Sequence, residues 1–164
     1  CSKDDDPVAV NEEEVITTLT VTLVPSDASA NIILKTQDLD GDGPNAPVVT
    51  VSGDLKASLA YRGSMKFENE TETPAEDITL EVVEEADEHQ VFYTVASGLS
   101  MIVTSTKDDS AGNPLGTEFN LSTNVASTGK LTFTLRHEPK KPNTGLADAG
   151  GSTDIEATFD IVIK

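Results

Sequence analysis

Two histidines are the residues of this 164-residue chain that are best suited to chemistry, and both lie near carboxylates. His89 closes an acidic run that includes Glu85, Asp87 and Glu88. His137 stands at the end of a stretch of alternating apolar residues. Imidazole nitrogens bind both Zn²⁺ and Cu²⁺ in proteins, and carboxylates complete such sites. We therefore take these five residues as candidate ligands of a Zn²⁺ or Cu²⁺ ion.

The same two histidines allow two other interpretations. A pair of imidazoles can ligate a haem iron axially, although aromatic residues make up only 4% of the chain and few remain to line a porphyrin pocket. The pair can instead be hydrogen-bonded residues at the rim of the core. All three interpretations stay open, because spacing along the chain does not fix the distance between His89 and His137.

A second candidate cation site is the segment Asp38-Leu39-Asp40-Gly41-Asp42-Gly43. It resembles the first half of an EF-hand-type calcium loop, in which alternating carboxylates converge on Ca²⁺. The resemblance stops there, because Val49 occupies the twelfth position, where such a loop has a bidentate Glu. The alternative is a polar turn, since Asp and Gly are common turn residues.

Charge and motifs narrow the class of function. The formal net charge of -18 argues against nucleic acid binding and against electrostatic docking on an anionic membrane. The sequence has no glycine-rich phosphate loop, zinc-protease helix or nucleophile elbow. We therefore expect a binding or accessory protein and not an enzyme.

The chain opens with a cysteine, and a short polar and acidic run follows it: Ser2, Lys3, Asp4, Asp5 and Asp6. This start resembles the mature N-terminus of surface-exposed outer-membrane lipoproteins of Bacteroidota. The resemblance implies a covalent lipid on Cys1, an export signal in the five residues after it, and an outer-membrane protein that faces the cell exterior. In addition, Asp109-Ser110-Ala111 resembles the O-glycosylation motif of that phylum, which makes Ser110 a candidate site.

The resemblance also implies a function and a partner. Residues 38–47, the acidic segment with His89, and residues 131–164 look like parts of small accessory lipoproteins associated with TonB-dependent transporters. We therefore expect a ligand-binding subunit of an outer-membrane β-barrel complex. The most specific version of this expectation is a subunit that captures metal for a transporter. The alternatives are a haem-binding surface lipoprotein and a calcium-stabilised structural or adhesive module.

Strands must position these residues, because apolar and polar residues alternate along much of the chain. In residues 131–136, for example, Leu131, Phe133 and Leu135 alternate with polar residues. The alternation predicts strands at residues 15–24, 31–37, 48–51, 57–67, 90–96, 100–106, 118–121, 131–136 and 155–164. Short strands separated by Gly, Pro, Asn and Asp predict an all-β, immunoglobulin-like antiparallel sandwich.

One segment follows a helical spacing instead. Residues 74–88 have apolar side chains at nearly helical intervals, with Thr73 as a possible cap and Pro74 at the first helical position. We expect one short helix here that crosses between the sheets. The predicted organisation is a flexible acidic tether at residues 1–14 and a sandwich domain at residues 15–164.

Overall fold

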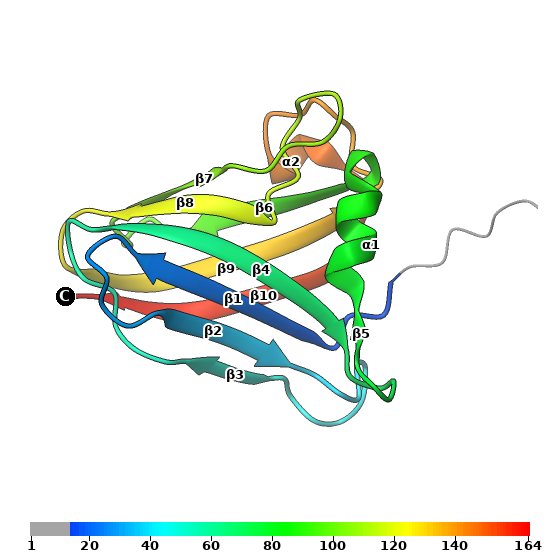
Figure 1. The fold of residues 1–164 in the computed structure, drawn as a ribbon, viewed down its shortest axis with the longest axis horizontal. Helices are drawn as coiled ribbons and strands as arrows, with labels where there is room; N and C mark the ends of the chain where they lie inside the picture. The colour runs from blue at the N-terminus through cyan, green and yellow to red at the C-terminus, as the bar shows by residue number, and fades with distance from the viewer. Residues whose placement is uncertain (1–13) are drawn as a thin grey trace, which may run out of the picture.

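The computed structural model describes residues 14–164, so the predicted lipidation and export residues at positions 1–6 lie outside the described residues. The described chain forms two antiparallel sheets that pack face to face, as the alternation predicted (Figure 1). None of the helices within residues 14–164 has the length and apolar character needed to span a membrane.

The larger sheet has seven strands, ordered β3-β2-β1-β4-β8-β7, with β5 paired to β4. Their bounds are β1 Thr18–Pro25, β2 Ile32–Gln37, β3 Val48–Val51, β4 Ala60–Asn69, β5 Glu76–Asp77, β7 Met101–Ser105 and β8 Glu118–Thr123. The smaller sheet is ordered β10-β9-β6, with β6 His89–Val95, β9 Ser127–His137 and β10 Ser152–Ile163. Most of these bounds lie within a few residues of the predicted strands.

The core lies between the two sheets and is formed by the inward-facing residue of each alternating pair. Four phenylalanines are at most 1% exposed, namely Phe67, Phe119, Phe133 and Phe159. The rings of Phe119 on β8 and Phe133 on β9 have centroids 5.7 Å apart, so aromatic contact joins the sheets directly. Burial of this apolar surface is the main force that holds the sheets together.

The crossing helix is present, but it is shorter than the spacing predicted. Helix α1 runs over Ile78–Glu84, and a 3-10 turn, η1, follows at Ala86–Glu88. The helix begins at Asp77, not at Thr73, because the Asp77 side chain accepts a hydrogen bond from the Thr79 amide and caps the first turn. The preceding residues pair with β4 as β5.

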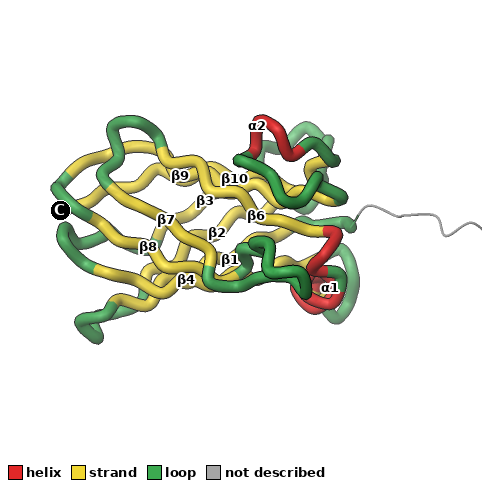
Figure 2. The backbone as a smooth tube through the Cα atoms, turned by 90° about the horizontal axis from the view of Figure 1, so that it is seen from above, coloured by secondary structure: helices red, strands yellow, loops and turns green. Residues whose placement is uncertain are grey.

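The helices gather at one end of the sandwich. Both views place α1 and a second helix, α2 (Leu146–Ala149), at the end where the described chain begins, opposite the C-terminus (Figures 1 and 2). The strand ends that carry both histidines lie at this same end, because η1 leads directly into β6.

Candidate metal centre

The two histidines lie side by side at one end of the smaller sheet. His89 is the first residue of β6, His137 is the last residue of β9, and the antiparallel register pairs them directly. Their ring centroids are 4.8 Å apart. Both side chains face inward, as the alternation predicted. They are fully buried, however, and not at the rim of the core.

A bulge in β10 brings a carboxylate to the same place. The register between β9 and β10 shifts between Thr153 and Ile155, which leaves Asp154 as an extra residue that turns toward the histidines. Gly151 lies just before the bulge with a φ of 74°, and a Cβ there would overlap the carbonyl oxygen of His137. Glycine at this position therefore allows β10 to pass close to the end of β9.

A second carboxylate reaches the histidines from the segment that leads into β1. Glu14 Oε1 lies 3.2 Å from His89 Nε2, and Glu14 Oε2 lies 3.3 Å from His137 Nδ1. Asp154 Oδ2 lies 3.6 Å from the same His89 nitrogen, and Asp154 Oδ1 lies 3.9 Å from His137 Nδ1. The four side chains are between 0% and 4% exposed. We call Glu14, His89, His137 and Asp154 the histidine–carboxylate cluster.

The spacing of this cluster suits a divalent metal ion. One ligand atom from each residue lies within 4.8 Å of all the others. Four ligands placed tetrahedrally at the bond lengths of Zn²⁺ would be about 3.3 Å apart, which is close to the separations observed here. Two ionised carboxylates and two neutral imidazoles carry a charge of about −2, which one divalent ion neutralises.

The cluster contains buried atoms that lack hydrogen-bond partners. His89 Nδ1 lies 3.1 Å from the carbonyl oxygen of Glu85, so an Nδ1–H donor there leaves the Nε2 lone pair directed at carboxylates. Nε2 has no hydrogen-bond partner, and neither does Oδ1 or Oδ2 of Asp154. Five buried side-chain atoms among residues 14–164 lack partners, and three of the five belong to this cluster. A cation between them would satisfy all three atoms.

The pKa shifts in the cluster reflect an excess of negative charge in a buried place. Burial and the neighbouring Glu14 charge raise the pKa of Asp154 to about 6. Burial opposes protonation of His137, but Glu14 and Asp154 outweigh it and raise its pKa. Burial likewise opposes ionisation of Glu14, but a hydrogen bond from its own backbone and the two imidazoles lower its pKa. Asp154 and His137 therefore take up protons at a higher pH than the free side chains do.

Further carboxylates surround the histidine–carboxylate cluster. Oxygens of Glu81 and Glu85 lie within 4.8 Å of Glu14, and oxygens of Glu88 and Glu138 lie within the same distance of His137. These four residues are exposed. They form an acidic rim around the buried histidine–carboxylate cluster, and the negative potential of such a rim favours cations.

The sequence predicted part of this ligand set. His89 and His137 are brought together as proposed, and Glu88 Oε2 lies 3.9 Å from His137 Nε2 at the rim. Glu85 contributes its backbone carbonyl to His89, while its side chain belongs to the rim. Asp87 does not belong to the histidine–carboxylate cluster, since its carboxylate accepts from the Ser110 hydroxyl, and its part in metal binding stays a prediction. Sequence reasoning missed Glu14 and Asp154.

The candidate glycosylation site lies in an exposed turn. The Ser110 hydroxyl donates to the Asp87 carboxylate, whose two oxygens are each 2.9 Å away. Ser110 itself is exposed, so the hydroxyl is within reach of an enzyme. Modification of Ser110 stays a prediction.

The candidate calcium loop is arranged as a turn. Asp40 accepts hydrogen bonds from the backbone amide and the side-chain Nδ2 of Asn45, and its carbonyl accepts from Gly43. Asp38, Asp40 and Asp42 are not among the groups of described residues whose ligand atoms lie within 4.8 Å of one another. The turn interpretation accounts for the contacts of Asp40, whereas Asp38 Oδ1 is buried without a hydrogen-bond partner, and calcium binding stays a prediction.

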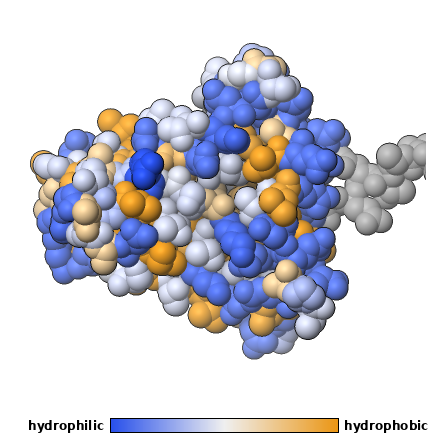
Figure 3. All heavy atoms as spheres, viewed as in Figure 1, coloured by the Kyte–Doolittle hydropathy of each residue, from blue (hydrophilic) through white to orange (hydrophobic). Residues whose placement is uncertain are grey.

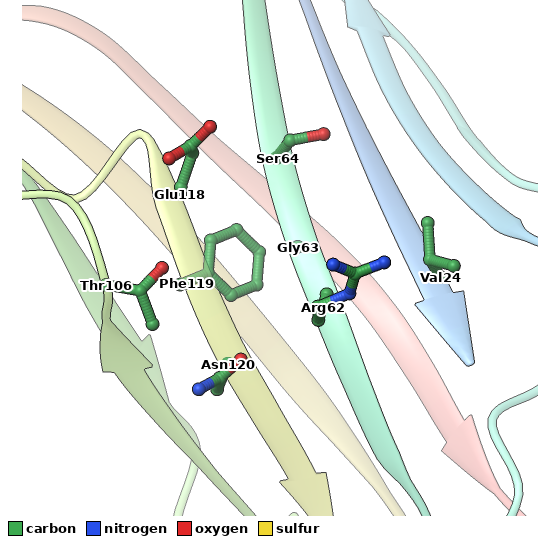
Figure 4. A pocket seen from close by; sticks show the side chains of 8 residues that line it. All are labelled: Val24, Arg62, Gly63, Ser64, Thr106, Glu118, Phe119 and Asn120. Atoms are coloured by element: carbon green, nitrogen blue, oxygen red, sulfur yellow. The ribbon is translucent and has the colours of Figure 1, made fainter. Parts of the chain in front are cut away.

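A shallow groove of about 350 Å³ lies on the outer face of the larger sheet (Figure 4). It is lined by Val24, Arg62, Gly63, Ser64, Thr106, Glu118, Phe119 and Asn120. None of the lining side chains has a buried atom without a hydrogen-bond partner. The face shown in Figure 3 is mostly hydrophilic, with scattered apolar side chains. Neither view indicates a ligand site as specific as the histidine–carboxylate cluster.

No protein-family model, curated protein or solved structure matches this chain. Function is therefore inferred from the chemistry of the cluster and from the resemblance of the N-terminal residues described above.

Proposed function

We propose that this chain is a non-enzymatic metal-binding protein that holds one Zn²⁺ ion in the histidine–carboxylate cluster. The observation that carries the proposal is the set of three buried, unpartnered atoms on His89 and Asp154, which face one another inside a cluster of excess negative charge. Burying such groups without a cation is costly, since each loses its hydration.

The ligands favour Zn²⁺ over the other candidate ions. Ca²⁺ takes oxygen ligands and six to eight of them, whereas half of this set is imidazole. Cu²⁺ prefers a square-planar or tetragonal arrangement, whereas the separations of 3.2, 3.3, 3.6 and 3.9 Å between the ligand atoms are close to the spacing of a tetrahedral Zn²⁺ site. Haem is not favoured, because the two rings already lie 4.8 Å apart and a porphyrin between them would have to separate them.

We further propose that the domain acts at the cell surface as an accessory subunit that captures metal for an outer-membrane transporter. The resemblance of Cys1 and the acidic run after it to surface lipoproteins supports this role, and so does the net charge of -18, which raises the local concentration of cations. Recovery of the protein from its native membrane together with a β-barrel would support the role. An unmodified Cys1 in that preparation would contradict the lipid anchor.

A structural role for the ion is the second candidate, and the burial of all four ligands favours it. Structural zinc sites are closed by four protein ligands, whereas sites that act on other molecules keep an open position. The exchange rate separates the two roles. A capture protein should release Zn²⁺ to a chelator within minutes at neutral pH, while a structural site should release it only on the timescale of unfolding.

Calorimetric titration with Zn²⁺ tests the proposed site. The wild-type chain is expected to bind one equivalent, and His89→Ala should weaken binding at least about a hundredfold, since a ligand and the fit of its neighbours are lost together. Glu84→Gln is the matched control, because Glu84 is an exposed carboxylate of α1 outside the groups described above. Equal affinity in His89→Ala and wild type would exclude the site.

A further inference from the structure

Three members of the cluster belong to one sheet and the fourth does not. His89, His137 and Asp154 lie on β6, β9 and β10, which form the smaller sheet. Glu14 lies before β1, on the segment that enters the larger sheet. An ion bound by all four would therefore tie this segment to the opposite sheet.

The cluster holds Glu14 in place. The first firmly bonded residue after it is Thr17, whose amide donates to the carbonyl of Glu68 and whose hydroxyl accepts from the amide of Glu70. Between Thr17 and Glu14, Val15 is 58% exposed. Ile16 packs partly against the hydrophobic core, and the buried Glu14 carboxylate is the polar contact that joins this segment to the histidines.

Several other carboxylates lie close to that of Glu14. The Glu14 carboxylate faces Asp154 within the cluster, and carboxylate oxygens of Glu81 and Glu85 lie within 4.8 Å of it. Like charges in a buried place repel strongly, because water screens them poorly. A divalent ion would relieve this repulsion at the point where the carboxylates meet.

We propose that binding of the metal ion fixes the N-terminal segment, residues 14–17, against the sandwich, and that the ion enters and leaves by displacement of Glu14. This inference rests on the proposed function, since the same ion is involved. Glu14 is the one member of the cluster that does not lie on a strand, so it can move without breaking a sheet. Metal occupancy would then determine how the chain leaves the domain on its N-terminal side.

Hydrogen exchange of the full chain, with and without Zn²⁺, tests this inference. Zinc is expected to slow exchange of the amides of residues 15–17 by about tenfold or more, while the central residues of β9 change little. Glu14→Gln should still bind Zn²⁺ through three ligands with lower affinity. At saturating Zn²⁺ it should lose the protection of residues 15–17. Glu84→Gln should behave as wild type in both respects.

Calorimetry on the same samples separates the possible failures. If Zn²⁺ binds and exchange at residues 15–17 is unchanged, the segment does not respond to the ion and this inference is overturned, while the metal site stands. If Glu14→Gln keeps both wild-type affinity and wild-type protection, Glu14 is not a ligand and the inference is again overturned. If the wild-type chain binds no Zn²⁺, both proposals are overturned.

Discussion

Two buried polar clusters lie on either side of η1, and they differ in how completely their atoms are satisfied. In the first, Lys141 Nζ donates to Asp109 Oδ2 at 3.1 Å and to the carbonyl of Ala86 at 2.8 Å. The other oxygen of Asp109 accepts from the amides of Ala111 and Asn113. We call Lys141 and Asp109 the lysine–aspartate cluster; their side chains are 6% and 1% exposed.

The second is the histidine–carboxylate cluster, which is buried to a similar degree but has neither balanced charge nor satisfied atoms. Its two carboxylates meet two imidazoles and no lysine or arginine, and three of its atoms have no hydrogen-bond partner. The lysine–aspartate cluster joins η1, the turn at Asp109 and the loop before α2, and it needs nothing further. The two clusters are therefore alike in burial and differ in whether their buried polar atoms have hydrogen-bond partners.

The largest expected effect comes from breaking the balanced cluster. Lys141→Met leaves the buried Asp109 carboxylate without its cationic partner, with only the amides of Ala111 and Asn113 as donors, and should cost about 3–5 kcal/mol of unfolding free energy. Urea unfolding measures this loss, which should be the same with and without Zn²⁺. Lys140→Met is the matched control, because Lys140 is exposed and its loss should change stability by less than about 0.5 kcal/mol. A loss below 1 kcal/mol in Lys141→Met would show that the pair contributes little.

Removing a charged group from the histidine–carboxylate cluster should raise the free energy of unfolding, whereas Lys141→Met lowers it. Asp154→Asn removes a charge whose pKa is raised to about 6, so the variant should be more stable than wild type by about 2–3 kcal/mol at pH 8 in a chelator. Thermal unfolding measures the difference. The variant should also lose the stabilisation by Zn²⁺ that wild type shows. Destabilisation of the metal-free variant would mean that Asp154 already has a stabilising partner.

The two clusters should also respond to pH in opposite directions when metal is absent. Because the pKa of Asp154 and that of His137 are raised, their contributions are present at low pH and are lost as pH rises through about 6 and beyond. Hydrogen bonds from Asn113 and Lys141 outweigh burial and lower the pKa of Asp109, so its contribution is present above about 4 and is lost in stronger acid.

Stability of the metal-free chain should accordingly fall by about 1–2 kcal/mol between pH 5 and pH 7, and Zn²⁺ should remove or reverse this fall because the ion needs deprotonated ligands. Denaturant titrations at several pH values measure the slope. Asp154→Asn should flatten it in the absence of metal. An unchanged slope in that variant would assign the pH dependence to other groups.

The fold followed from the sequence more fully than the site did. Alternation such as that of Leu131, Phe133 and Leu135 reports directly which side of a strand meets the core, so the sandwich and the inward direction of His137 could be predicted. The start of the helix could not, because Asp77 and Thr73 are both acceptable caps and pairing with β4 decided between them.

Glu14 and Asp154, the two cluster members that sequence reasoning missed, were missed for different physical reasons. Asp154 has the parity of a solvent-facing residue, and only the bulge, which depends on the pairing of β9 with β10, turns it inward. Glu14 ends a polar run that is typical of a flexible tether, and its partners His89 and His137 lie far from it in the sequence. The contact between His89 and His137 likewise depends on the register between strands, which residue spacing does not encode.

The smallest expected effect defines the outer boundary of the histidine–carboxylate cluster. Glu88 Oε2 lies 3.9 Å from His137 Nε2, the nitrogen that faces away from Glu14, and its side chain is 53% exposed. A partner at that distance orients the imidazole only weakly, so Glu88→Gln should lower Zn²⁺ affinity by less than about tenfold and leave metal-free stability unchanged. Calorimetric titration measures the Zn²⁺ affinity of Glu88→Gln and of Glu14→Gln, and Glu14→Gln should show the larger loss of affinity. A hundredfold loss in Glu88→Gln would place the ion at the acidic rim and not among the buried ligands.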